Sequence, residues 1–362
     1  MSRSVCRFPN RFLLLTRAVL LCITVILLLY VSASAASGAR EGLALCGELL
    51  IPSLFPMMVL SSLLQHSGTA DVLGRLLAPF VKGLFRLPPC AGTAFLTAML
   101  GGYPAGARSI RTLLEQHRIT AAQAARMLLF CVGAGPGFVI SAVGCGLFGS
   151  RLLGIVLYTA QVLSAVLLGI CSRFGTKVSS ENTVTPVFAK SLSFAEALTT
   201  SVHEAASAML TLCATVIVFS SLQAVVFSLL PTQAPFVRLL FSVLLEVTEG
   251  VRTARSAASP VLTAFALGWG GFCTHAQVFA VSGMRCRYFF VFRFLHGLLT
   301  ALFTAGMWQV LAPHNPVFLP AGTVPHVAAS AVHGGVSAAL MCLTAVFTLS
   351  ITADSADKVH RT

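Results

Sequence analysis

The feature of this sequence that most constrains its fold is a series of long, continuous apolar runs. Four of them are uninterrupted, at 152–171, 206–230, 289–311 and 336–352. About 20 apolar residues in a helix span the hydrocarbon core of a bilayer, and continuous rather than alternating runs indicate helices, not barrel strands. Only 10% of the residues are charged, against roughly 25% in a soluble domain. We therefore predict an all-α polytopic integral membrane protein.

The N-terminal 40 residues resemble a signal peptide. Four arginines between positions 3 and 17 precede the apolar run 18–31, and a small-residue sequence follows it and ends at Ala35. The alternative is an uncleaved first transmembrane helix, because the apolar stretch is just long enough to span. We favour the uncleaved helix. In either case we expect its basic end in the cytoplasm.

The net charge of +13 is explained by basic residues in the loops of a membrane protein. Basic residues gather between apolar runs, in 75–86, 108–126 and 285–293, as they do in cytoplasmic loops. We therefore expect the lipid bilayer as a partner, and no nucleic acid. The eleven cysteines form no CxxC pair and no zinc spacing, so we expect no metal and no cofactor.

Four other apolar runs contain glycine or proline near their middle. They lie at 43–64, 91–110, 127–148 and 261–281. A break at membrane depth frees backbone groups that lipid cannot satisfy, so it is found where protein or a watery cavity surrounds it. Discontinuous helices of this kind build the binding sites of secondary transporters. The four runs therefore predict a site near the membrane midplane.

Two short sequences recur in the same order, and they suggest two related halves. We predict an N-terminal helix at 1–40, a first half at 41–175, a linker at 176–192 and a second half at 193–312. A last region at 313–362 would hold a final transmembrane helix and a polar tail. Chance is the alternative, since glycine and alanine are abundant. The matches are Phe130-x-x-Gly133-x-Gly135 with Phe265-x-x-Gly268-x-Gly270, and Ala107-Arg108-Ser109 with Ala254-Arg255-Ser256.

Acidic residues and histidines inside apolar segments are costly and usually functional. Glu246 and Glu249 are three residues apart and share one helical face. Such a pair could bind a cation or a proton, or hydrogen-bond a solute. For Glu249 we favour pairing with Arg252 or Arg255 at the membrane edge. His275 and Gln277 could also bind a solute, and a packed, hydrogen-bonded histidine is an equal alternative.

The glycine-rich strings could bring backbone close to a ligand. A helix that restarts after the run 101–108 would direct its N–H groups at an anion. Arg108 would add charge there, or simply anchor a cytoplasmic loop. The glycines at 133–137 have a rival explanation as close helix packing.

Signatures of enzymes are missing from the sequence. It contains no Walker motif, no GxSxG and no HExxH. We therefore expect no enzymatic activity, with an intramembrane protease or a lipid-modifying enzyme as the alternative.

At these same strings the chain resembles the YlbJ-type sporulation integral membrane proteins, within the wider group that carries the nucleoside-recognition (Gate) domain. The resemblance covers roughly residues 40–312. Position 101 is Gly where the family has Ser. The matching residues are Gly102-Tyr103-Pro104-Ala105-Gly106-Ala107-Arg108, Gly135-Pro136 with Val143-Gly144, Glu246-x-Thr248-x-Gly250, and Gly270-Gly271 with His275-Ala276-Gln277.

The resemblance implies a multi-pass protein of the cell or forespore membrane of endospore-forming bacteria, related to nucleoside-type transporters. It also implies movement of dipicolinate, a small aromatic dianion, into the spore. Our leading hypothesis is a transporter of a small solute. The coupling ion would be H+ or Na+, and the chain could assemble with copies of itself as a homo-oligomer. The alternatives are a non-transporting sporulation scaffold or gate, and a nucleoside transporter. The expected solute-binding residues are Gly102, Tyr103, Pro104, Gly106, Arg108, Gly135, Pro136, Glu246, Thr248, Gly270, Gly271, His275 and Gln277.

Overall fold

The computed structural model describes residues 11–175, 192–229, 235–256 and 259–311. Within these ranges every regular element is a helix. The predicted linker, apart from Leu192, and the predicted last transmembrane helix lie outside the described residues. The chain is an all-α, multi-pass integral membrane protein, as predicted. Four of the described helices are long and apolar enough to span a bilayer: Ser32–His66, Arg151–Phe174, Phe194–Leu229 and Phe289–Leu311.

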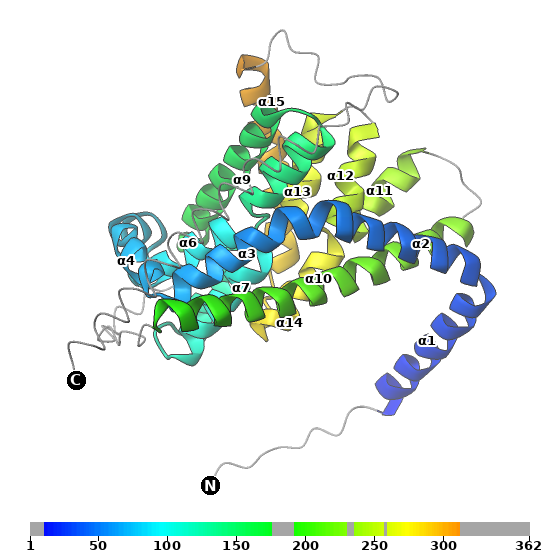
Figure 1. The fold of residues 1–362 in the computed structure, drawn as a ribbon, viewed down its shortest axis with the longest axis horizontal. Helices are drawn as coiled ribbons and strands as arrows, with labels where there is room; N and C mark the ends of the chain where they lie inside the picture. Colours follow the sequence, from blue (N-terminus) through cyan, green and yellow to red (C-terminus); the bar gives the residue numbers. More distant parts are fainter. Residues whose placement is uncertain (1–10, 176–191, 230–234, 257–258, 312–362) are drawn as a thin grey trace.

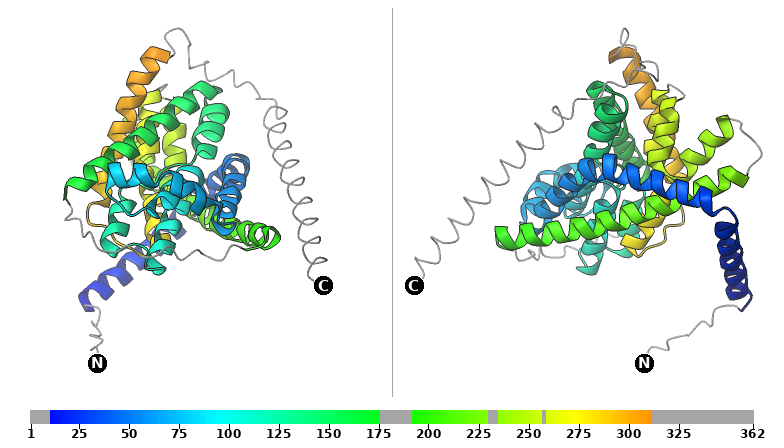
Figure 2. Two further views of the ribbon diagram at one scale, coloured as in Figure 1. Left: turned by 90° about the vertical axis from the view of Figure 1, so that its left-hand side faces the viewer. Right: turned by 45° about the vertical axis from the view of Figure 1, so that its right-hand side comes forward.

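The N-terminal region contains a short projecting helix followed by a very long one. Helix α1 (Arg11–Tyr30) ends in a turn at Val31 and points away from the rest of the molecule (Figures 1 and 2). The next helix is continuous and comprises α2 (Ser32–Leu45), the π-helical turn η1 (Cys46–Leu50) and α3 (Ile51–His66). The domain boundary predicted at residue 40 therefore falls inside a helix.

This long helix also corrects the expectation of a break in the run 43–64. Pro52 lies directly after the π-helical turn, and Pro56 lies inside α3. Proline lacks the N–H that an α-helix uses, and the wider hydrogen-bonding pattern of a π turn lets the helix continue past it. The run is a continuous wall, not a broken helix.

The amphipathic segment after the long helix consists of three short helical pieces. The first of them packs closely on the helix that begins at residue 91. A Cβ placed on Gly74 would lie only 2.4 Å from the hydroxyl of Thr93 in that helix. The pieces are α4 (Thr69–Leu76), α5 (Ala78–Phe80) and η2 (Val81–Phe85).

The remainder of the first half has two interrupted helices and one continuous helix. The first interruption is the single residue Gly102, and the second is the irregular stretch 129–135. The elements are α6 (Ala91–Gly101), α7 (Tyr103–Glu115), α8 (Ala121–Leu128), the π helix η3 (Gly137–Leu147), α9 (Arg151–Cys171) and the 3₁₀ turn η4 (Ser172–Gly175).

The second half repeats this order of elements. A long helix, α10 (Phe194–Leu229), is followed by one helix interrupted at Glu246 and another interrupted at Gly270. A continuous helix, α15, then completes the half. The elements after α10 are α11 (Pro235–Leu245), α12 (Val247–Ser256), α13 (Pro260–Trp269), α14 (Gly271–Ser282) and α15 (Phe289–Leu311).

The two long helices pack side by side and antiparallel (Figures 1 and 2). The thiol of Cys46 in η1 donates to the carbonyl oxygen of Cys213, 3.8 Å away in α10. Towards the other end of the pair, Ser62 donates to the carboxylate of Glu204 at 2.7 Å. As the residue number increases along α2–α3, the number of the contacting residue in α10 decreases, so the two helices are antiparallel. An antiparallel relation between equivalent helices is the arrangement of inverted-topology repeats in transporters.

Candidate functional site

A cavity of about 50 Å³ lies where the four interrupted helices meet. The two long helices complete its wall. Three of the interruptions fall in runs expected to be broken, and the fourth, at Glu246, replaces the one expected in 43–64. The lining residues are Leu50, Leu54, Met58, Gly101, Gly102, Tyr103, Pro104, Ala134, Gly135, Phe138, Leu212, Val216, Glu246, Val247, Thr248, Cys273, Thr274 and Gln277.

In the first half the two interruptions pack directly against each other. Gly102 has φ 80°, and a Cβ placed on it would lie 3.0 Å from the amide nitrogen of Gly135. Only glycine combines this backbone conformation with so close an approach. No side chain caps the N-terminus of α7, and Pro104 lies in its first turn. This helix N-terminus therefore reaches the cavity wall without a capping group.

In the second half a carboxylate marks the corresponding interruption. Glu246 is 1% exposed and lines the cavity. Its Oε2 accepts a hydrogen bond of 2.7 Å from the backbone N–H of Glu249, in the first turn of α12. A negative charge is favourable at a helix N-terminus. Glu246 therefore caps α12 and replaces glycine or proline as the cause of the break.

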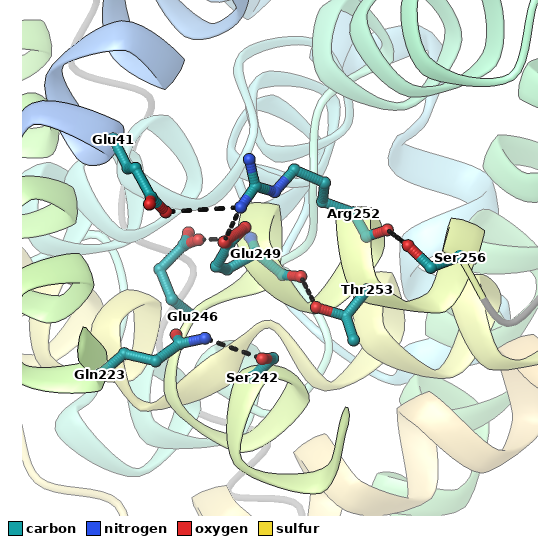
Figure 3. A network of polar contacts seen from close by, with 8 residues as sticks. All are labelled: Glu41, Gln223, Ser242, Glu246, Glu249, Arg252, Thr253 and Ser256. Atoms are coloured by element: carbon teal, nitrogen blue, oxygen red, sulfur yellow. Dashed lines mark hydrogen bonds and ion pairs between the residues drawn. The ribbon is translucent and has the colours of Figure 1, made fainter. Parts of the chain in front are cut away.

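Glu249 and Arg252 connect Glu246 to the surface (Figure 3). Arg252 donates to Glu249 at 2.6 Å, which is the pairing favoured from the sequence, and it approaches Glu41 of α2 at 3.5 Å. Exposure falls along this series: the side chains of Glu41, Arg252 and Glu249 are 57%, 48% and 10% exposed. The series therefore runs from the surface to a cavity-lining carboxylate.

The fourth interruption has two consecutive glycines with positive φ. Gly270 has φ 88° and Gly271 has φ 77°, and a Cβ on Gly271 would lie 3.0 Å from the backbone of Glu246. The interruptions of the second half thus pack together like those of the first. Gln277 of α14 lines the cavity.

His275 does not line the cavity. Its Nε2 lies 2.8 Å from the carbonyl oxygen of Trp269, and its ring packs edge-on against Trp269 at a centroid distance of 4.6 Å. Phenylalanines at 272, 289 and 290 surround it. The structure therefore places this histidine in an aromatic cluster, the alternative left open by the sequence.

Arg293 is part of this region, although its place in the sequence groups it with the basic residues 285–293. The side chain belongs to α15 and is 0% exposed. It donates to the carbonyl oxygens of Gly268 and Val132, to that of Trp269 at 3.4 Å and to the hydroxyl of Tyr103 at 3.4 Å. A cation is favourable at the C-terminal end of a helix such as α13. The available signal was its position inside an apolar run.

Tyr103 connects the first interruption to the fourth. Its hydroxyl donates a hydrogen bond of 2.7 Å to the carbonyl oxygen of Leu267 in α13. With Arg293 it ties interruptions of both halves into one hydrogen-bonded group behind the cavity.

Arg108 lies beside the main cavity rather than in its wall. It approaches Glu204 of α10 at 3.2 Å, and Glu204 also approaches His66 at 3.1 Å and accepts from Ser62. Arg108 and Glu204 border a second cavity of about 20 Å³, which shares Met58 and Pro104 with the main one.

The Arg108–Glu204 pair has a counterpart at the other end of the long helices. Arg108 follows the interruption at Gly102 by six residues, and Arg252 follows Glu246 by six. Counted from the interruptions, Arg108 therefore corresponds to Arg252, which corrects by three residues the match of Arg108 with Arg255 made from the sequence. Each arginine pairs with a glutamate on the long helix of the opposite half, Glu204 or Glu41. Of the other expected residues, Gly106 packs against the carbonyl oxygen of Cys131, and Pro136 immediately precedes η3.

The two halves contribute different chemistry to the cavity. The first half supplies an apolar wall that includes Tyr103, Pro104 and Phe138. The second supplies the polar side chains of Glu246, Thr248, Thr274 and Gln277. Among the described lining residues, Glu246 alone has a charged side chain, and the described part of the chain has no cluster of three or more metal-ligating side chains. The cavity therefore has an apolar side and a side with hydrogen-bonding groups.

Comparison with known proteins identifies a family match in the part of the chain that contains the first two interruptions. Residues 49–151, which include the first two interruptions, match the Gate family, described as nucleoside recognition. The chain is 27% identical to the sporulation integral membrane protein YlbJ of Bacillus subtilis (strain 168), in an alignment of 324 residues that covers 77% of this chain and 79% of the relative. No solved structure matches. The resemblance to YlbJ-type sporulation membrane proteins with a Gate domain, inferred from the glycine-rich motifs, is therefore confirmed.

Proposed function

We propose that this chain is a transporter or facilitator, not an enzyme, that moves a small aromatic solute through the cavity in the course of spore formation. The observation that carries the proposal is the convergence of four interrupted helices, two from each half, on one cavity. Interrupted helices at the interface of related halves are the usual site architecture of secondary transporters. The role in spore formation is taken from the name of the relative.

Transport also requires movement, because the cavity is small in this structure. Its volume of about 50 Å³ is well below the roughly 150 Å³ of a cavity that binds benzene. A solute with an aromatic ring therefore requires the halves to separate. The pairs Arg108–Glu204 and Arg252–Glu41 lie towards opposite ends of the antiparallel long helices. We assign to them the closure of the cavity on its two sides.

For the solute we propose dipicolinate, with a nucleoside as the second candidate. The apolar wall, which includes Tyr103 and Phe138, suits the ring of either molecule. A dianion is accepted only if the carboxyl group of Glu246 is neutral, because two like charges in a water-poor cavity repel each other strongly. The uncharged remainder of the lining and the description of the Gate family are the grounds for the second candidate.

Uptake into proteoliposomes that contain the purified chain tests this proposal, with dipicolinate and uridine offered in parallel. We expect saturable uptake of one of them, and its loss in Gly102→Leu, because a side chain there meets Gly135. Gly306→Leu is the matched control, since a Cβ at Gly306 meets nothing within 4 Å. Absence of uptake of both probes by folded wild-type protein would favour a scaffold in the spore membrane.

A further inference from the structure

The carboxylates near the cavity are distributed unequally between the two halves. The outer pairs, Arg108–Glu204 and Arg252–Glu41, occur in both. The inner carboxylates occur only in the second half: the positions that correspond to Glu246 and Glu249 in the first half are Gly102 and Ala105. Figure 3 shows the series of ionisable groups that leads from the surface to the cavity at this end, and the described residues of the other end offer no equivalent of its inner carboxylates.

Among the buried polar atoms at this end that have no hydrogen-bond partner in the described residues, two are acceptors only. One is Oε2 of Glu249, and the other is Oε1 of Gln223 in α10, whose residue is 5% exposed. Burying an acceptor without a donor costs about 1–3 kcal/mol. A protonated carboxyl group would supply a donor of the kind that these atoms lack. A metal ion fits less well, because a hard cation takes about six oxygen ligands and no such cluster exists in the described part of the chain.

We propose that Glu246 is a proton-binding site that couples solute movement to protons, and that Glu249, Arg252 and Glu41 give it access to one side of the membrane. This inference rests on the proposed transport function. The other titratable groups that act on Glu246 are the thiols of Cys46 in η1 and Cys273 in α14.

The cycle follows from the position of Glu246 in the cavity wall. When the Arg252–Glu41 pair opens, water reaches Glu249 and Glu246, and a proton from water binds a carboxylate oxygen of Glu246. The neutral cavity then accepts an anionic or polar aromatic solute. When the Arg108–Glu204 pair opens instead, the solute leaves and the carboxyl group returns its proton to water on that side.

The first test measures accumulation of dipicolinate and uridine in proteoliposomes with a proton gradient. One coupled proton gives about tenfold accumulation for a gradient of one pH unit, because one unit corresponds to a factor of ten. We expect this gradient dependence in the wild type and its loss in Glu246→Gln. Glu115→Gln is the control and should keep it, because Glu115 is 61% exposed and pairs with Arg111 away from the cavity lining. An undiminished gradient response in Glu246→Gln, or accumulation driven by sodium alone, overturns the proposal.

A second measurement does not depend on transport. Infrared difference spectra of the reconstituted protein between neutral and acidic pH should contain the C=O band of a buried protonated carboxyl group, separate from the band of exposed carboxyl groups such as that of Glu115. The band should disappear in Glu246→Gln and persist in Glu115→Gln. If neither probe is transported but this band behaves as expected, the transport proposal fails for these solutes and the proton site stands. If uptake is present while the band is unaffected by Glu246→Gln, the proton site is refuted and transport stands.

Discussion

Nε2 of His296 in α15 lies 3.2 Å from the backbone carbonyl oxygen of Gln161 in α9, and its Nδ1 lies 3.1 Å from that of Gly268. Gln161 has the corresponding place in the first half, where its side-chain amide donates to the carbonyl oxygen of Ala134 at 2.7 Å. Each continuous helix thus holds one interruption by a side chain. His296 also joins the two helices to each other.

Replacement of His296 tests this bridging role. In His296→Leu the carbonyl oxygen of Gly268 or of Gln161 loses a buried donor, and we expect the free energy of unfolding to fall by about 1–3 kcal/mol. His296→Gln, which copies the residue of the first half, should recover much of the loss. Thermal unfolding in detergent measures both. Equal stability of the leucine variant and the wild type would show that the ring does not hold the interruption.

Replacement of Arg293 should lower the stability more than replacement of His296, because Arg293 donates hydrogen bonds to more carbonyl groups. Arg293→Met leaves the carbonyl oxygens of Gly268 and Val132 without this donor, at about 1–3 kcal/mol for each. Arg293→Lys should rescue only partly, since an ammonium group lacks the planar fork of a guanidinium. Melting temperature and the yield of monodisperse protein are the measurements. A methionine variant that folds and melts like the wild type contradicts this role.

The two outer ion pairs should act on opposite sides of the membrane. Cys273 lines the cavity and is 1% exposed, so a membrane-impermeant thiol reagent reports when the cavity opens. In a protein with Cys273 as its single cysteine, Glu204→Gln should speed labelling from one side and Glu41→Gln from the other. Labelling of both variants from the same side would exclude their assignment as opposing closures.

Passage of the solute through the main cavity can also be tested by filling the cavity with a larger side chain. Thr248→Trp would fill the polar wall of the main cavity, whose volume is about 50 Å³. We expect it to abolish uptake while the protein still inserts and folds. Thr199→Trp, at an exposed position near the start of α10, is the control. Normal uptake by the Thr248 variant would place the solute path elsewhere.

Much of the architecture could be predicted from local patterns. Apolar runs gave the class, and glycines at positive φ, such as Gly102 and Gly270, marked two interruptions correctly. The same rule failed at Pro52, where the preceding π-helical turn accommodates a residue without an N–H, and at Pro56, where α3 continues without a break. It also missed Glu246, where a side chain that caps α12 ends the preceding helix without glycine or proline.

Other features depend on partners distant in sequence, and no local pattern contains them. Arg293 looks like a loop residue beside Arg285 and Arg287, yet its partners lie up to 190 residues away. His275 is near the glycine pair in sequence, but the side of α14 on which it lies packs against aromatic rings. Placing such residues requires knowledge of which helices pack together.

The length of the two antiparallel helices has a consequence for the surrounding lipid. The helix from α2 to α3 has 35 residues and α10 has 36, so each is about 50 Å long at 1.5 Å per residue. The hydrocarbon core of a bilayer is only about 30 Å thick. Helices of this length accommodate the mismatch by tilting or by emerging through both headgroup layers, and the cost changes with bilayer thickness by fractions of a kcal/mol per Å. The length of the lipid acyl chains therefore affects the tilt of the two long helices, which form one wall of the cavity. Membrane thickness should in this way influence the shape of the cavity.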